Sequence, residues 1–186
     1  MANAPPRIIT DRLVLRLPEV SDARAILAYY EENRDHLSPW EPARSASFYT
    51  LAHWEEQATR AARDWRDDLA LRLHLFDRER PREMVGYIGF SGITRGVAQF
   101  CFMGYSIAAR RQGTGLMLEA AEAALGHVFG PLRLRRVMAN YMPSNHRSAR
   151  LLERLGFAIE GYAREYLLID GKWQDHVLTS KTNPRW

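Results

Sequence analysis

Residues 110–117 read Arg110-Arg111-Gln112-Gly113-Thr114-Gly115-Leu116-Met117 and lie directly between a strand-like and a helix-like segment. Glycines at such a place let the backbone turn tightly and bring bare N–H groups close to a ligand. The following helix adds its unpaired amides and the positive end of its dipole, and the two arginines add cations. The segment therefore predicts a pyrophosphate-binding site, with all eight residues as candidate contacts.

Two other kinds of phosphate-binding loop do not fit these residues. A Walker A loop needs Gly-Lys followed by Ser or Thr, whereas Gly115 is followed by Leu116 and Met117. A dinucleotide-binding fingerprint needs a third glycine, and position 118 is leucine. A plain glycine turn at the start of a helix remains an alternative as long as the segment is considered alone.

The segments on both sides predict one α+β domain over residues 1–186. Seven segments have the alternation or the apolar runs of strands: 11–17, 69–76, 84–93, 97–107, 134–141, 162–169 and 173–180. Four segments have helical spacing or capping signals: one that begins at Ser21-Asp22, then 51–67, 113–129 and 145–155. This order predicts a mixed, mostly antiparallel sheet of seven strands flanked by about four helices.

The composition favours a cytoplasmic protein. Of the 186 residues 46% are hydrophobic and 26% charged, and no apolar run is long enough for a membrane-spanning helix. The first six residues lack the apolar run of a signal peptide. Cys101 is the single cysteine, which excludes an internal disulfide, and the six histidines have no metal-ligand spacing. We therefore expect no membrane contact and no metal.

The charge pattern is not typical of a nucleic-acid-binding protein, although a mildly basic face could still help to bind a polyanionic cofactor or to meet a ribosome. The net charge is +4, and acids and bases are interleaved between Arg60 and Arg82. A nucleic-acid-binding surface more often has a dense patch of one sign. We therefore expect no direct, sequence-specific binding to nucleic acid.

Two segments together resemble the GNAT acetyltransferases. Arg110, Gly113 and Gly115 match the family hallmark Arg/Gln-x-x-Gly-x-Gly/Ala. Downstream, Asn145-x-x-Ser148 with residues 151–157 is similar to the second family segment. The resemblance implies the GNAT fold, in which the fourth strand splays from the fifth, and acetyl-CoA as the cosubstrate.

Further segments resemble the ribosomal-protein-alanine acetyltransferases, and in particular their RimJ branch. They are residues 10–16, 37–42, 138–143, 160–162 and 166–173. The resemblance runs from about residue 8 to the C-terminus. It implies that the acceptor is the N-terminal alanine α-amine of the fifth small-subunit ribosomal protein, free or within the assembling subunit.

The resemblance also implies roles for residues on the cofactor side. The main-chain groups of Tyr105, Ser106 and Ile107 would bind the pantetheine arm, and one of their N–H groups would polarise the thioester carbonyl. Asn145 would contact the pantetheine. Ser148, on the same helical face, would donate a hydrogen bond to the leaving sulfur. A solvent-facing serine, with protonation by water, is the alternative. The tyrosine acid of many family members is excluded here, because its position is Leu152.

The acceptor side is less well defined by the sequence. An N-terminal amine has a pKa of about 7.7–8.0, so a weak base or a water chain is enough. Glu165 is the candidate base, although the matching family position is Leu167, two residues further on the same face of a regular strand. Trp40, Glu41 and Tyr29 are the candidate acceptor contacts, because aromatics would hold a small side chain and an acid would meet the ammonium. The alternatives are an exposed strand glutamate and aromatic core residues.

Two other functions remain open from the sequence. The first keeps the chemistry but uses another amine, such as a free amino acid, a polyamine or a drug. The second is a ribosome-associated module that binds acetyl-CoA without turnover.

Overall fold

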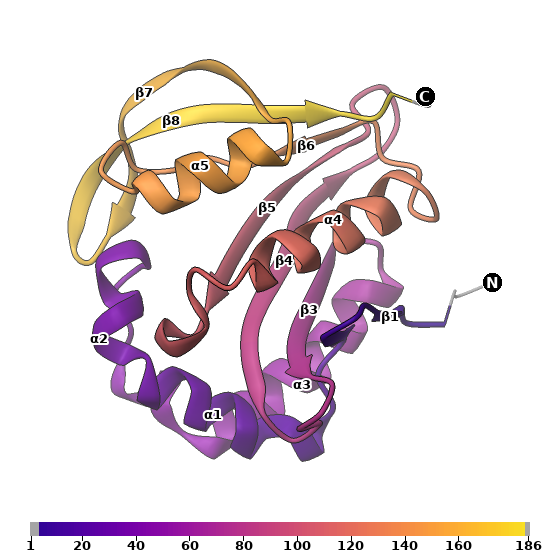
Figure 1. The fold of residues 1–186 in the computed structure, drawn as a ribbon, viewed down its shortest axis with the longest axis vertical. Helices are drawn as coiled ribbons and strands as arrows, with labels where there is room; N and C mark the ends of the chain where they lie inside the picture. The colour runs from indigo at the N-terminus through magenta and orange to yellow at the C-terminus, as the bar shows by residue number, and fades with distance from the viewer. Residues whose placement is uncertain (1–3, 185–186) are drawn as a thin grey trace.

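The computed structural model describes residues 4–184, so residues 1–3 and 185–186 of the predicted domain lie outside the described part. One open sheet runs through the molecule in the order β1-β2-β3-β4-β5-β6-β8-β7 (Figure 1). The strands are β1 (Arg7–Ile9), β2 (Leu13–Arg16), β3 (Ala70–Asp77), β4 (Met84–Thr94), β5 (Phe100–Ile107), β6 (Arg136–Met138), β7 (Ala158–Ile169) and β8 (Lys172–Thr182). The α-helices are α1 (Ala23–Glu32), α2 (Arg34–Leu37), α3 (Leu51–Arg66), α4 (Leu116–Phe129) and α5 (His146–Arg154).

The α+β class and the element order agree with the sequence prediction, but the described residues contain eight strands and five α-helices instead of seven and about four. The additional strand, β1, has three residues, and the additional helix, α2, has four. Hydrophobic periodicity needs longer segments than these. Asn33 separates α2 from α1, and its side chain donates to the Tyr29 carbonyl at 2.8 Å and accepts from the Ala109 N–H at 2.8 Å.

Helices cover both faces of the sheet and give two hydrophobic cores. Leu71, Leu73 and Leu75 of β3 belong to the core that contains the buried residues of α4, whereas Phe76 belongs to the core with α1 and α3. This is the alternation that a strand covered on both faces requires. Figure 1 shows α4 crossing in front of β3 to β5 and α5 in front of β6 and β8.

The sheet opens between β5 and β6. β5 pairs with β4 along its length, but it pairs with β6, in parallel, only at residues 100–102. Beyond this point the chain follows β8 instead, since the Ala139 N–H donates to the Thr179 carbonyl and Tyr141 bridges to Val177. Residues 103–107 of β5 therefore have no strand on that side, which is the splay expected between the fourth and fifth predicted strands.

A hairpin of β7 and β8 forms the end of the sheet. Its turn has positive φ at Asp170 (45°) and Gly171 (73°), as a two-residue hairpin turn of type I′ requires. The register is broken between Ala163 and Leu167, which pair with His176 and Gln174. Three residues of β7, 164–166, thus lie opposite one residue of β8, and the strand bulges.

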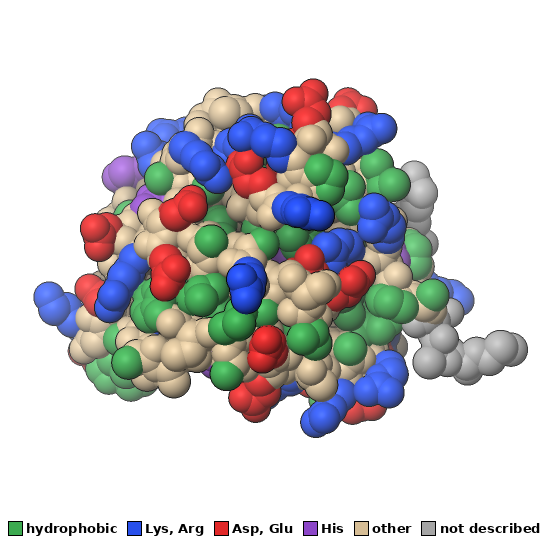
Figure 2. Space-filling model, turned by 90° about the horizontal axis from the view of Figure 1, so that it is seen from below, with side chains coloured by type: hydrophobic (Ala, Val, Ile, Leu, Met, Phe, Trp, Pro, Cys, Tyr) green, Lys and Arg blue, Asp and Glu red, His purple; other side chains and the backbone are tan. Residues whose placement is uncertain are grey.

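The surface of the described part has mixed charges. Figure 2 shows Lys and Arg interspersed with Asp and Glu on the face that it presents, which agrees with the interleaved pattern in the sequence. None of the described helices is long and apolar enough to span a membrane.

Candidate functional site

A cleft of about 730 Å³ lies where β5 and β6 diverge. Its walls are formed by the end of β5, the glycine segment, α5 and residues between 36 and 41. Thirteen of the residues predicted for the site line it: Trp40, Glu41, Tyr105, Ser106, Ile107, Arg111, Gln112, Gly113, Gly115, Leu116, Met117, Asn145 and Ser148. The fold thus brings residues from four separate parts of the chain to one cleft.

The glycine segment has the backbone that its sequence predicts. Gly113 and Gly115 have φ values of 74° and 80°, in the left-handed region that favours glycine. Gly115 is the N-cap of α4 without a side-chain cap, so no side chain at the cap satisfies the first amides of the helix. Thr114 does not line the cleft, because its hydroxyl donates to the Arg111 carbonyl at 2.7 Å.

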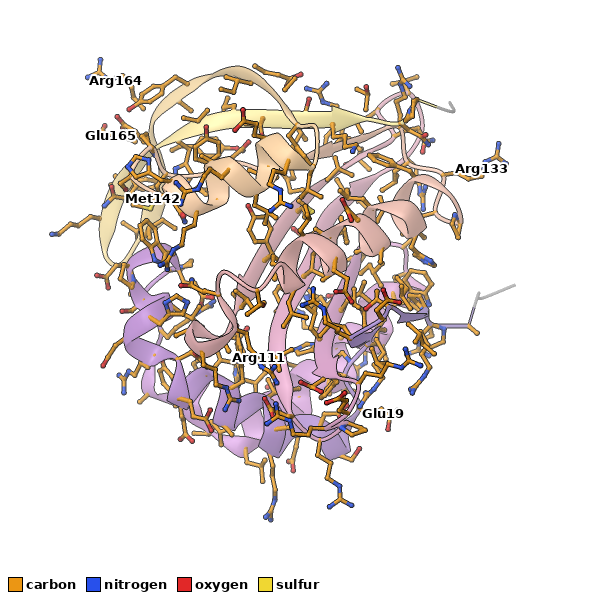
Figure 3. All side chains as sticks on the ribbon, in the orientation of Figure 1. Glu19, Arg111, Arg133, Met142, Arg164 and Glu165 are labelled. Atoms are coloured by element: carbon orange, nitrogen blue, oxygen red, sulfur yellow. The ribbon has the colours of Figure 1, made fainter. Side chains whose placement is uncertain are left out.

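The two arginines of this segment are held by carboxylates. Arg110 pairs with Glu83 at 3.0 Å and with Glu32 at 3.8 Å, and it faces a different hollow of the surface. Arg111 pairs with Asp77 and, at 3.1 Å, with Glu83. Figure 3 shows Arg111 close to the loop that precedes α4. These acids offset much of the positive charge that the sequence predicted for this end of the cleft.

Cations that the sequence analysis missed come from α5. Arg147, Arg150 and Arg154 line the cleft, and none of them forms an ion pair within residues 4–184. Arg147 donates to the side-chain carbonyl of Gln112. Their spacing of three and four residues places them on one helical face, and this spacing is the signal that was available in the sequence.

The predicted serine meets a tyrosine side chain across the cleft. The hydroxyl oxygens of Ser148 and Tyr105 are 2.5 Å apart. Burial raises the pKa of Tyr105 to about 12, and the hydrogen bond with Ser148 acts against this rise. Asn145 caps α5, since its side-chain oxygen accepts from the Ser148 N–H at 3.0 Å. From the sequence, only the main chain of Tyr105 was expected to contact a ligand.

Trp40 and Glu41 line the cleft from the N-terminal part of the chain. Trp40 is 39% exposed. The Glu41 carbonyl accepts from the Asp170 N–H at 3.0 Å, so this turn meets the tip of the β7–β8 hairpin. The Glu41 carboxylate pairs with Arg44 at 2.9 Å. Within residues 4–184, Glu41 supplies the carboxylate that lines the cleft.

Tyr29 does not line the cleft. It is 2% exposed and belongs to the core that includes α3, where its ring packs edge-to-face on Tyr30. Its hydroxyl donates to the Ser106 hydroxyl at 2.9 Å. Burial raises the pKa of Tyr29 above its ordinary value. Tyr29 therefore supports β5 from the other face of the sheet instead of contacting a ligand directly.

Glu165 is also absent from the cleft lining. It is exposed in the bulge of β7, with φ of 46°, and its N–H donates to the Asp175 carboxylate at 2.8 Å. Figure 3 shows Arg164 and Glu165 on the outer side of β7, away from the space between α4 and α5. The bulge breaks the alternation that would have put Glu165 and Leu167 on one face.

No metal centre is apparent in the part of the chain that the structure describes, since no three of its His, Cys, Asp or Glu residues are grouped to hold an ion.

The chain is similar to known proteins over its whole length. The sequence model described as "Acetyltransferase (GNAT) domain" matches residues 12–158. The [Ribosomal protein uS5]-alanine N-acetyltransferase of Escherichia coli is 45% identical, over 100% of this chain and 95% of the relative. The ribosomal-protein-S5-alanine acetyltransferase of Vibrio fischeri has a similar structure, with a TM-score of 0.92, 36% identity and coverage of 99% of both chains. The structure of Mycobacterium smegmatis RimJ in complex with CoA-disulfide matches with a TM-score of 0.87, 28% identity and coverage of 98% of this chain and 87% of that one. With these matches, the chain belongs to the GNAT acetyltransferase family.

Proposed function

We propose that this protein transfers the acetyl group of acetyl-CoA to the N-terminal alanine of ribosomal protein uS5. The observation that carries the proposal is the cleft in the splay of the sheet, lined by the glycine segment and by Ser148. The proposal is also supported by the 45% identity to the Escherichia coli enzyme, whose name gives uS5 alanine as its acceptor. The proposal includes a cytoplasmic location and an acceptor that is free or part of the assembling small subunit.

The cofactor would lie along the wall formed by residues 105–117. The open main-chain groups of Tyr105, Ser106 and Ile107 suit the amides of pantetheine, and the amides from Gly113 to the start of α4 suit the pyrophosphate. We assign the cationic contacts to the arginines of α5 in addition to Arg111, because the α5 side chains have no carboxylate partner among residues 4–184.

The reaction needs a neutral amine, a polarised carbonyl and a stabilised leaving group. The amine nitrogen attacks the thioester carbon, a main-chain N–H at the end of β5 binds the developing oxyanion, and Ser148 donates to the sulfur. Glu41 is the carboxylate that we propose to bind the acceptor ammonium and to assist its deprotonation. The α-amine has a pKa of about 7.7–8.0, so a weak base is enough. Glu165 as the base stays a prediction.

Release of free thiol from acetyl-CoA with a peptide of the uS5 N-terminus tests this function. The matched control is the same peptide with its α-amine blocked, and mass spectrometry maps the acetyl group. Release that disappears on blocking, with the acetyl group on the terminal nitrogen, is the expected result. Release that persists, or that another amine supports better, would assign a different acceptor. Binding of acetyl-CoA without release from any amine would favour the non-catalytic module.

A further inference from the structure

We propose that the side chain of Tyr105 is a positioning residue, which fixes the Ser148 hydroxyl as a hydrogen-bond donor toward the departing sulfur. The inference rests on the acetyl transfer proposed above and deepens it. Its basis is the contact between two hydroxyl groups that come from opposite walls of the cleft.

The contact crosses the place where the sheet opens. Tyr105 belongs to the part of β5 that has no β6 partner, and Ser148 belongs to the first turn of α5. Both residues line the cleft, and their hydroxyl oxygens are 2.5 Å apart. The tyrosine therefore reaches across the gap to the helix that carries the proposed donor.

The next residue of β5, Ser106, has its side chain on the opposite face of the sheet from Tyr105. Ser106 follows Tyr105 and points to the other face of the sheet, where it accepts from Tyr29 at 2.9 Å. Tyr105 packs against the core that contains α4, whereas Tyr29 lies in the core with α1 and α3. Both contacts join a tyrosine hydroxyl to a serine hydroxyl. Only the contact between Tyr105 and Ser148 includes a hydroxyl group of α5, at the cleft.

The chemistry of the two hydroxyls decides which one donates. Each carries one proton and two lone pairs. A phenol is a stronger acid than an aliphatic alcohol and is the better donor, and within residues 4–184 Ser148 is the side-chain hydrogen-bond partner of the Tyr105 hydroxyl. With the tyrosine proton given to Ser148 Oγ, the serine proton must point elsewhere. No backbone carbonyl among the described residues accepts a hydrogen bond from the Ser148 hydroxyl. We therefore infer that its proton points into the cleft.

In the transfer step the N–C bond forms, the C–S bond breaks and its electron pair goes to sulfur. The Ser148 O–H stabilises that charge, and both hydroxyls keep their protons. Full proton transfer from Tyr105 would be uphill, because its pKa of about 12 exceeds that of a thiol, about 8.5. The proton lost by the attacking nitrogen is the one that neutralises the thiolate through solvent. Tyr105 therefore acts through Ser148 without touching the reacting atoms.

A double-mutant cycle tests the proposal, with kcat and both KM values measured on the uS5 peptide. Ser148→Ala should lower kcat about 100-fold, the loss expected for one donor to a developing charge. Tyr105→Phe keeps the ring, and it should lower kcat about 10-fold while changing the KM for acetyl-CoA by no more than about 2-fold. The double variant should be no slower than Ser148→Ala, because Tyr105 has no route to the sulfur except the serine.

The matched control is Tyr29→Phe, which removes the other tyrosine–serine contact of this strand. Its effect should multiply with that of Ser148→Ala. Multiplicative losses for Tyr105→Phe and Ser148→Ala, or an unchanged kcat in Tyr105→Phe, would overturn the positioning role alone. A wild-type protein that releases no thiol with the peptide would instead overturn the proposed function and this inference with it.

Discussion

The two walls of the cleft are built in different ways. One wall, which we propose to bind the cofactor, is nearly continuous in sequence, since residues 105–117 supply the end of β5, the glycine turn and the start of α4. The opposite wall combines Trp40 and Glu41, helix α5 and, through one backbone hydrogen bond, the hairpin tip at Asp170. A wall made from one segment can be recognised as a motif, whereas a wall made from distant segments depends on tertiary structure. Substitutions in each wall can therefore test this contrast.

The largest effect should come from the continuous wall. Gly115→Ala puts a side chain at φ of 80°, so the loop should shift and move the amides that we propose to bind the pyrophosphate. A misplacement of this kind should lower kcat/KM for acetyl-CoA about 100-fold. Gly96→Ala is the matched control, because Gly96 has φ of 69° in a loop outside the cleft. This variant should be less stable than the wild type but should keep its kinetic constants. Equal kinetic losses in both variants would show that the glycine loop acts only through folding.

The opposite wall is tested by comparing Glu41, which lines the cleft, with Glu165, which does not. Glu41→Gln removes the carboxylate that lines the cleft and should lower kcat/KM for the peptide about 30-fold, with a smaller change in the KM for acetyl-CoA. Glu165→Gln is the comparison, and steady-state kinetics with both substrates is the measurement. Because Glu165 is exposed in the bulge, we expect the smaller loss there. The reverse order of effects would restore Glu165 as the base and move the acceptor to the outer side of β7.

Smaller changes in the KM for acetyl-CoA should distinguish the arginines of α5 from Arg110 of the glycine segment. Arg150→Gln and Arg154→Gln should each raise the KM for acetyl-CoA about 5-fold at low salt, because exposed cations contribute modest, screened energies. Neither change should alter kcat. Arg110→Gln should have less effect, since Arg110 already pairs with Glu83 and Glu32 and faces another hollow. The KM values at two salt concentrations check the order; a larger shift for Arg110 would return the phosphate contacts to the glycine segment.

The difference between the walls also explains what the sequence could predict. The turn at Gly113 and Gly115 depends on local backbone conformation, so the residues themselves reveal it. The charge available from Arg111 depends on Asp77 and Glu83, which come from the end of β3 and the loop after it. No local pattern shows that these carboxylates pair with Arg111.

The position of Glu165 has the same kind of cause. A regular strand would alternate its side chains, but β7 bulges where Asp175 of β8 accepts the Glu165 N–H and the Tyr162 hydroxyl at 2.8 and 2.6 Å. The bulge depends on a cross-strand partner, which periodicity along one strand does not reveal. The order of the elements along the chain, the four longer helices and the splay were predictable because they depend on longer patterns and on a family resemblance.

The smallest expected effect concerns the support of the continuous wall. Glu119, in the first turn of α4, accepts from the Thr10 hydroxyl at 2.6 Å and from the Arg12 N–H and guanidinium at 3.0 and 2.7 Å. Burial alone would raise the pKa of Glu119, but the hydrogen bonds from Thr10 and Arg12 outweigh it and hold the pKa below its usual value. Glu119→Gln should therefore lower the free energy of unfolding by about 1 kcal/mol at pH 7, by urea denaturation.

The pH dependence of this difference gives the sharper test. A carboxyl with a lowered pKa in the folded state stabilises the protein above its unfolded pKa of about 4.3, and this stabilisation is lost as pH falls through the folded value. The gap between wild type and Glu119→Gln should accordingly be constant from pH 7 to about pH 5 and shrink below about pH 4. A gap that is unchanged in acid would mean that Glu119 contributes by shape and neutral hydrogen bonds. The charge of its carboxylate would then add nothing to the anchoring of α4 beside the glycine turn.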